Sequence, residues 1–270
     1  MLDIAQLEEQ AKKIRQDIIK MLGAAGSGHP GGSLSSTDLM TALFFNILRQ
    51  KPKEPRWPGR DRFILSKGHC APVLYACLAE LGYFPIEQLL TLRKLGSCLQ
   101  GHPSCQDVAG VEVSTGSLGM GLSVATGMAL GAKFDQSDVR VYCLVGDGEL
   151  QEGQIWEAAM SAGHYRLDNL CCIVDNNDLQ IDGRIKEVMN VYPIADKFKA
   201  FGWQAMEIEG HDFKQILAAY DRASKTKEKP TVIIARTIKG KGISFMEDQE
   251  EWHGKAPNKE LTAKALKELE

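Results

Sequence analysis

The sequence predicts an α/β protein built on a doubly wound parallel sheet. Short β-branched apolar runs alternate along the chain with longer segments of helical periodicity, which is the pattern of a parallel sheet covered by helices. Two of these runs, residues 139–145 and 170–175, end in glycine and polar residues. Ligands of open parallel sheets bind beyond the carboxyl ends of the strands, so we expect a binding site at this edge.

The N-terminal half begins with a helix, because residues 3–22 place apolar side chains at helical spacing beneath a charged outer face. A loop rich in glycine, serine, histidine and proline follows, and Ser35 or Ser36 is the expected cap of the next helix. The elements expected after residue 22 are a loop at 23–33, a helix that ends at residue 48, a strand at 63–65, helices at 71–81 and 87–95, and a long loop at 98–112.

The C-terminal half continues the alternation of strands and helices. The elements expected here are a glycine-rich turn at 114–121, a helix at 122–133, the strand at 139–145, a helix at 149–166, the strand at 170–175, a loop over the site at 178–191, a helix at 194–201, a strand at 204–209, a helix at 213–224, a strand at 231–237, a mobile turn at 239–242 and a charged, solvated helix at 259–270.

Length and composition exclude several classes of protein. The 270 residues fit one α/β domain, and a net charge of -3 argues against a dedicated nucleic-acid binder. No apolar run approaches the ~20 residues of a membrane helix, and the acidic start lacks the pattern of a signal peptide. The seven cysteines form no paired framework, and Cys143, Cys171 and Cys172 lie in apolar runs, so we expect buried thiols and a cytoplasmic setting.

Oxygen-bearing side chains follow two neighbouring strands of the predicted sheet. Gly146-Asp147-Gly148 comes directly after the first strand, and Asn176-Asn177 ends the second. Magnesium prefers such oxygen ligands together with phosphates, and the glycines allow close approach of a phosphate near a helix start. The pattern therefore favours a magnesium-bridged diphosphate over the alternative of a tight turn and an asparagine-rich loop.

Four of the six histidines stand in loops beside glycine or proline: His29, His69, His102 and His253. Histidine, with a pKa near ~6.5, is suited to proton transfer at neutral pH. Their shared loop setting favours a catalytic role over the structural role that is usual for a single histidine. His164 and His211 are assigned to structure.

The motifs in this order resemble the transketolase family across nearly the whole chain. The matching stretches are Ser27–Gly31, Ser66–His69, Gly101–Pro103, Thr115–Gly119, Gly146–Gly153, Asn176-Asn177 and Trp252–Gly254. The resemblance implies the thiamine-diphosphate-binding fold, with residues 1–270 as a single diphosphate-side domain. It also implies thiamine diphosphate and Mg²⁺ as cofactors, with Ca²⁺ or Mn²⁺ as substitutes for the metal ion.

The resemblance also assigns roles to individual residues. Asp147, Asn177 and the backbone carbonyl of Leu179 would bind the metal ion, and Gly148 would offer its N–H to a phosphate. Glu152 resembles a buried glutamate that reaches across a subunit interface, although a first-turn helix acid is an equally good interpretation. The remaining expected contacts are His69, His253, Gly116, Ser117, Leu118 and Gly146 with the cofactor or the reacting centre, and His29 and His102 with the sugar.

The activity implied by the resemblance is transfer of a two-carbon ketol unit between sugar phosphates. The family's pyrimidine-binding and C-terminal domains are not accounted for in this sequence, so we expect them on a partner chain. The expected assembly is α2β2, and we expect this chain to be inactive without its partner. A deoxyxylulose-phosphate synthase-like enzyme and a transketolase for an unusual sugar are the alternatives. Ser117 and Met120 depart from the residues common in the family, but neither touches the expected proton chemistry.

Overall fold

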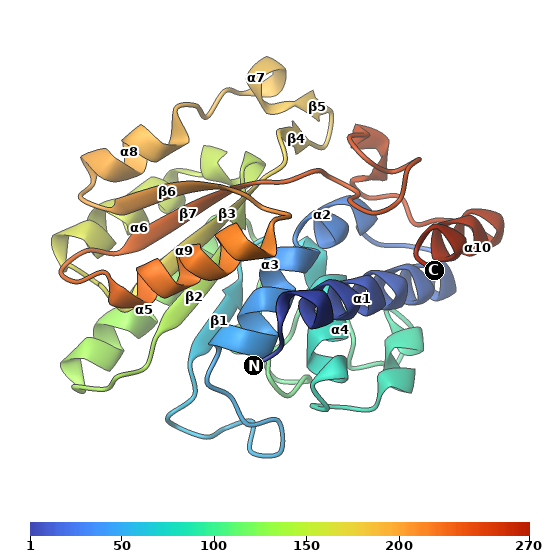
Figure 1. Ribbon diagram of the computed structural model, residues 1–270, viewed down its shortest axis with the longest axis horizontal. Coiled ribbons are helices and arrows are strands. Elements are labelled where there is room, and N and C mark those ends of the chain that lie inside the picture. The colour runs from blue at the N-terminus through green and yellow to red at the C-terminus, as the bar shows by residue number, and fades with distance from the viewer.

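A computed structural model of the protein describes residues 1–270 and contains a central sheet of five parallel strands (Figure 1). The strand order is β1-β2-β3-β7-β6, with no antiparallel pair in this sheet. The strands are β1 (Arg62–Leu65), β2 (Val141–Gly146), β3 (Leu170–Asn176), β6 (Gln204–Glu209) and β7 (Thr231–Arg236). The predicted doubly wound α/β fold is confirmed.

Alternate side chains of each strand enter two separate hydrophobic clusters, one on each face of the sheet. In β2, Tyr142 and Leu144 belong to one cluster, whereas Val141, Cys143 and Val145 belong to the other. Both sets are buried, which is why the strand sequences are continuously apolar instead of alternating. The predicted burial of the cysteines in β2 and β3 is confirmed, and these thiols are free.

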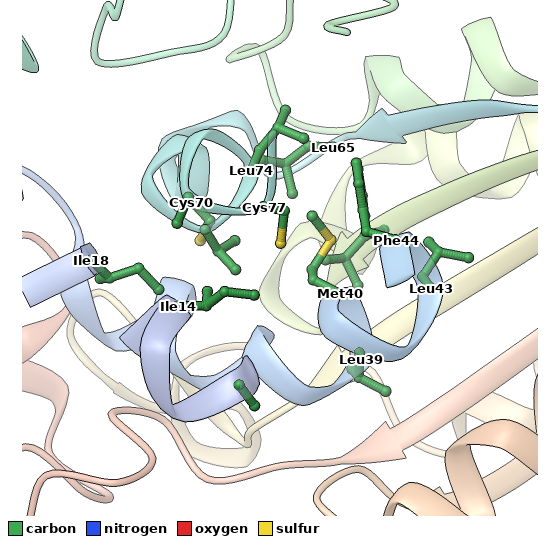
Figure 2. Packing of buried hydrophobic residues seen from close by; sticks show 14 of the residues in the cluster. Ile14, Ile18, Leu39, Met40, Leu43, Phe44, Leu65, Cys70, Leu74 and Cys77 are labelled. Carbon is green, nitrogen blue, oxygen red and sulfur yellow. The ribbon is translucent and has the colours of Figure 1, made fainter. Parts of the chain in front are cut away.

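The larger cluster lies between the sheet and the helices of one face. These helices are α1 (Ile4–Ala25), α3 (Thr37–Ala42), α4 (Ala71–Glu80) and α9 (Phe213–Lys225). Figure 2 shows Ile14 of α1 pointing toward Met40 of α3 and Cys77 of α4, with Ile18 farther along α1 on the side of Cys70. Helix α1 begins as predicted, because the side chain of Asp3 accepts a hydrogen bond from the N–H of Gln6 and the side chain of Gln6 accepts one from the N–H of Asp3, which forms a capping box.

The smaller cluster lies under the helices of the opposite face. These helices are α5 (Met120–Phe134), α6 (Gly153–His164) and α8 (Ile194–Ala200). The predicted helix at 149–166 is corrected, because a 3-10 turn, η4 (Gly148–Gln151), comes first and α6 begins only at Gly153. The buried carboxylate of Glu149 folds back onto the N–H of Gly146, which holds this turn away from α-helical geometry.

Short elements surround the carboxyl ends of the strands. The predicted second helix begins at Thr37 as α3, with Ser36 at its cap position as expected but without a side-chain capping bond, and a short helix that was not predicted, α2 (Pro30–Ser35), precedes it. The π-helical turn η1 (Leu43–Ile47) follows α3. Within the expected loop at 178–191, the chain forms a small antiparallel hairpin and a helical turn. The other short elements are η2 (Gly68–Cys70), η3 (Ile86–Thr91), β4 (Leu179–Gln180), β5 (Gly183–Arg184), α7 (Ile185–Val188) and η5 (Glu250–Trp252).

Helix α10 (Lys259–Glu268) has an exposed charged face, as predicted, while its other side lies along α1 and buries Ala265 (Figure 1). One expectation for the C-terminal region is wrong. The turn at 239–242 is not a mobile surface turn, because the side chain of Lys239 is buried and hydrogen-bonded. The charged sequence of this turn gave no sign of these contacts, because burial of a lysine depends on partners that are distant in the chain.

No helix has the length and apolar character needed to cross a membrane.

Candidate active site

The predicted site residues converge at the carboxyl edge of the sheet. Gly146 lies beside Asp175 in the register of β2 and β3, and Asn176 lies beside Arg236 in that of β3 and β7. The segments that follow β1, β2, β3 and β7 therefore meet at one edge, as strand-order reasoning predicts. Helix α2 and the turn η5 approach the same edge from the other parts of the chain and bring His29 and His253 with them.

Asp147 is a buried carboxylate without a cationic partner in hydrogen-bond contact. Its oxygens accept hydrogen bonds from the N–H groups of Gly148 at 2.8 Å and Asp178 at 2.6 Å. Burial, and next the charge of Asp175, raise the pKa of Asp147 to about 7. An ionised carboxylate is therefore costly here unless a cation joins it, which is what a metal ligand requires.

Asn177 and Leu179 place further oxygens close to Asp147. The side-chain oxygen of Asn177 accepts from the N–H of Leu179 at 3.2 Å, and its NH₂ donates to Asp175 at 3.0 Å. The carbonyl of Leu179 accepts from the ammonium of Lys239 at 3.1 Å. One carboxylate, one amide and one carbonyl form an all-oxygen donor set, which suits a hard cation. No group of three His, Cys, Asp or Glu side chains is arranged to hold a metal ion anywhere in the chain, and this donor set contains a single carboxylate.

Lys239 is a site residue that the sequence did not reveal. Its ammonium also lies 3.0 Å from Nδ1 of His253, and because lysine only donates, His253 accepts there and carries its proton on Nε2. Burial lowers the pKa of Lys239 to about 8, although Asp147 opposes this shift. A buried positive charge beside the predicted metal and diphosphate position is what an anionic ligand needs.

Three of the four predicted histidines form one cluster. The ring centroids of His29, His69 and His253 are separated by 5.1 to 5.5 Å. Buried Nδ1 of His29 has no hydrogen-bond partner. An unpaired, buried nitrogen on a ring that lies beside two other histidines is a candidate contact for a polar ligand, since buried polar atoms are otherwise satisfied.

The pKa values of these histidines lie below the value of ~6.5 on which the sequence argument relied. Burial, followed by neighbouring positive charge, lowers the pKa of His29 and His69 to about 4 and that of His253 to about 3. All three are therefore neutral at pH 7. As neutral imidazoles they can both donate and accept hydrogen bonds, and each would be protonated only transiently.

His102 lies apart from this cluster, on a more exposed loop that carries a substrate-sized cavity. Its ring packs against Gly116, where an added Cβ would lie 3.0 Å from the ring. The cavity, of about 490 Å³, also borders Ser27 and Arg93. Sequence reasoning missed Arg93, whose guanidinium lies against Gly101.

The predicted cofactor contacts outside the histidine cluster lie on the open side of the site. Ser117 and Leu118 are exposed, and Gly148 is half-buried with its N–H directed at Asp147 instead of into a separate anion pocket. Glu152 is also exposed and makes no side-chain capping bond to α6, although it stands at the cap position. It is therefore not a buried residue within this chain, and its side chain is free to meet a partner.

A buried network around Asp175 joins the ends of four segments and was not predicted. The carboxylate accepts hydrogen bonds from Lys67 and Ser35 at 2.6 Å each, from Asn177 at 3.0 Å, and from Thr237. Burial opposes its ionisation, but Lys67 holds the pKa of Asp175 below its usual value. Asp175 thus fixes the side chain of a predicted metal ligand, in the manner of outer-shell residues at metal sites.

Removing one charge of this network is expected to destabilise the fold. Lys67→Met would leave Asp175 as a buried, uncompensated carboxylate, at a cost of about 3–5 kcal/mol. Urea unfolding of the isolated chain measures this free energy. The double variant Lys67→Met with Asp175→Asn removes both charges and should recover much of the loss. A Lys67→Met chain as stable as the wild type would contradict the arrangement.

Comparison with known proteins agrees with this geometry. Residues 7–269 match the family model described as "Transketolase, thiamine diphosphate binding domain". The chain belongs to the transketolase family. It is 45% identical over 264 residues to a 6-deoxy-6-sulfo-D-fructose transketolase subunit of Clostridium sp., covering 98% of this chain and 96% of that protein. It is 43% identical to an apulose-4-phosphate transketolase subunit of Phocaeicola vulgatus, covering 99% and 95% of the two chains.

Longer transketolases match this chain through one part of their length. Human transketolase is 46% identical over 97% of this chain and 42% of its own. The crystal structure of Campylobacter jejuni transketolase superposes with a TM-score of 0.94 and 37% identity, over 99% of this chain and 43% of that one. The chain is therefore an N-terminal transketolase subunit with a thiamine-diphosphate-binding domain, and its subunit-type relatives indicate a partner subunit.

Proposed function

We propose that this transketolase subunit forms the diphosphate- and metal-binding half of an active site that transfers a two-carbon ketol unit between sugar phosphates. The observation that carries the proposal is the cluster of His29, His69 and His253, with ring centroids within 5.5 Å of one another, beside the oxygen donors of Asp147, Asn177 and Leu179. Thiamine diphosphate, when bound, supplies the stabilisation of the substrate carbanion.

The residues of this chain bind and orient that group. Asp147, Asn177 and the carbonyl of Leu179 hold Mg²⁺, for which Ca²⁺ or Mn²⁺ can substitute, and Lys239 neutralises the diphosphate. A bound metal ion would replace the hydrogen bond that Lys239 now makes to Leu179. Gly116, Ser117 and Leu118 would contact the organic part of the cofactor on the open side of the site, and Gly146 and Gly148 would contact its phosphates.

The neutral histidines donate and accept hydrogen bonds at the reacting oxygen atoms. His253 presents Nε2–H, because Lys239 occupies its Nδ1. His29 offers its unpaired Nδ1, and the ring of His69 lies 5.1 Å from that of His29 and 5.2 Å from that of His253. His102 and Arg93 border the cavity of about 490 Å³ in which the sugar chain and its hydroxyls would lie. Such contacts hold a substrate carbonyl in place and move protons as the carbon–carbon bond changes.

The second candidate function differs from the first in the sugars that the enzyme uses as donor and acceptor. Subunits named for 6-deoxy-6-sulfo-D-fructose and for apulose 4-phosphate match this chain over nearly their whole length, at identities similar to those of transketolases without a sugar in their names. A transketolase for an unusual sugar is thus a specific alternative to the common ketose phosphates. We expect the complex with its partner to use one of these ketoses as donor and not pyruvate.

The partner is inferred to carry the pyrimidine-binding side of the site, in an α2β2 assembly with two-fold symmetry. Helix α5 supports this inference, because Met120, Leu130 and Phe134 are exposed along a helix that has no charged residue before Lys133. Apolar surface of this kind marks an interface. Glu152 stands at the start of the neighbouring helix α6, where it would contact the partner.

Seven free cysteines agree with a reducing cytoplasm.

The function is tested by purifying the chain with the partner that it retains and assaying ketol transfer with thiamine diphosphate and Mg²⁺. Xylulose 5-phosphate, fructose 6-phosphate, 6-deoxy-6-sulfofructose and apulose 4-phosphate are compared as donors, with pyruvate as the contrasting donor. Turnover of any of the ketoses supports the proposal and identifies the donor. Turnover of pyruvate alone would contradict it.

Replacing His253 is expected to slow turnover of the assembled enzyme by about 10²–10⁴, the usual contribution of a positioned acid–base group. His253→Ala removes both nitrogens, whereas His253→Asn keeps a short polar side chain near Lys239 but cannot reach as far as Nε2. Both should be slow if Nε2 contacts substrate. His164→Ala, an exposed histidine at the end of α6, is the control and should turn over normally. Wild-type turnover by both His253 variants would remove His253 from the mechanism.

A further inference from the structure

The turn that carries Lys239 is fixed by hydrogen bonds from three other segments. The N–H of Ile238 donates to Nε2 of His211 at 2.9 Å. The N–H of Gly240 donates to the carbonyl of Gly31 at 3.0 Å, and Nε of Arg15 donates to the carbonyl of Lys241 at 3.1 Å. Ile238 immediately precedes Lys239, so this hydrogen bond controls the position of the backbone from which the Lys239 side chain extends.

Asp38 fixes the protonation state of His211. Nδ1 of His211 lies 2.6 Å from the carboxylate of Asp38, which also accepts two hydrogen bonds from Arg15 at 2.9 and 2.7 Å. Burial would raise the pKa of Asp38, but Arg15 and His211 hold it below its usual value, so the carboxylate is ionised. A carboxylate only accepts and a backbone N–H only donates. His211 must therefore carry its proton on Nδ1 and present a bare Nε2 to Ile238.

These contacts form one chain of hydrogen bonds from α1 and α3 to the edge of the active site. Arg15 orients Asp38, Asp38 selects the tautomer of His211, and His211 holds the backbone at Ile238. The next residue, Lys239, reaches back with its ammonium to the carbonyl of Leu179 and to Nδ1 of His253. Asp38 and His211 touch none of the predicted ligand-binding groups, so any effect on the site passes through the backbone.

We propose that His211 is a positioning residue: its Nε2 holds Ile238 so that the Lys239 ammonium stays in place for the metal-bound diphosphate. The positioning rests on the contacts above, and only the ligand of Lys239 rests on the proposed function. The sequence offers no signal for this role, because a histidine after Gly210 at a strand end looks like an ordinary structural residue.

Two substitutions separate the two nitrogens of His211. In His211→Gln the side-chain oxygen can reach the position of Nε2 and still accept from Ile238. In His211→Asn the shorter amide matches Nδ1, so it can donate to Asp38 but cannot reach Ile238. Hydrogen exchange of residues 237–242, measured on the full chain without cofactor, should be faster by about tenfold or more in His211→Asn and close to wild type in His211→Gln. Binding of thiamine diphosphate with Mg²⁺ by the chain with its partner should weaken by about 10–100-fold in His211→Asn, the usual effect of an outer-shell change.

Controls make the two parts of the proposal separable. Equal exchange rates in His211→Asn and wild type would overturn the positioning role, as would equal losses in the Asn and Gln variants. Lys239→Met should weaken cofactor binding at least as much as His211→Asn. Unchanged cofactor binding in Lys239→Met would contradict the contact between Lys239 and the diphosphate that the proposed function assigns. The hydrogen-exchange result would still support the role of His211 in positioning the turn. If His211→Asn does not fold, ¹⁵N NMR of wild-type His211 decides, because a protonated Nε2 would overturn the proposal.

Discussion

Asp147→Ala is expected to abolish retention of thiamine diphosphate and Mg²⁺ by the assembled enzyme. Asp147 is the one carboxylate in the predicted donor set, and burial holds its pKa at about 7, so a divalent cation is needed to stabilise its charge. Gel filtration of the complex, followed by assay of bound cofactor, measures the effect. Asp182→Ala removes a carboxylate from the exposed hairpin over the same site and should leave retention unchanged.

The stability of the isolated chain distinguishes a metal ligand from a structural residue. The folded-state pKa of Asp147 is raised above its ordinary value of 3.8, so the ionised form opposes folding at pH above that value in the absence of a metal ion. Asp147→Asn removes the charge and keeps an oxygen for one of the two N–H groups that Asp147 binds, whereas its NH₂ would face the other N–H. Because the Asn variant has no carboxyl group to titrate, it should lose less stability than the wild type as the pH rises through about 7 without metal, although it no longer retains cofactor. Retention of cofactor with unchanged Mg²⁺ dependence would disprove the assignment.

The fold was predictable because its signals are local. Buried parallel strands such as residues 170–175 read as continuous apolar runs, and the helices between them have regular periodicity. Errors occurred where tertiary contacts decide the backbone. Glu149 pulls η4 into a 3-10 turn through its hydrogen bond with Gly146, and this contact leaves no periodic trace in the sequence. The short helix α2 at Pro30 was also not predicted, although the helix after it begins at Thr37 with Ser36 at its cap position, as expected.

The candidate site was predictable in its motif residues and not in its supporting charges. Asp147 and Asn177 stand at strand ends beside glycine or asparagine, where topology alone brings them together. Lys67, Asp175 and Lys239 are buried, but lysines and aspartates are almost always exposed unless they are paired. Their pairing joins residues more than 100 positions apart in the case of Lys67 and Asp175, so composition and periodicity carry no sign of it.

The chain without its partner is expected to show no ketol transfer, because the proposed function assigns the pyrimidine-binding side of the site to the partner subunit. Ser117 and Leu118, the predicted cofactor contacts at the start of α5, are exposed here, and so is Glu152. A cofactor held on this side alone would remain open to water, which weakens every electrostatic contact that the histidines and Lys239 make. The assay compares the purified chain, with thiamine diphosphate and Mg²⁺, before and after addition of the partner. Substantial activity of the chain alone would contradict the split-enzyme interpretation.

The interface itself can be tested at Gly127, which faces outward on α5 between Met120 and Leu130. A Cβ at Gly127 would meet no atom within 4 Å, so Gly127→Glu fits the isolated chain, and glutamate is the better helix former. If the partner packs on this apolar face, a buried unpaired carboxylate would oppose association and ketol transfer would be lost. Ala218→Glu, at an exposed position of α9 on the other face of the sheet, is the matched control and should assemble normally. We expect the Gly127→Glu chain to melt no lower than the wild type and yet to elute alone when mixed with the partner. Normal assembly of that variant would place the partner on another face.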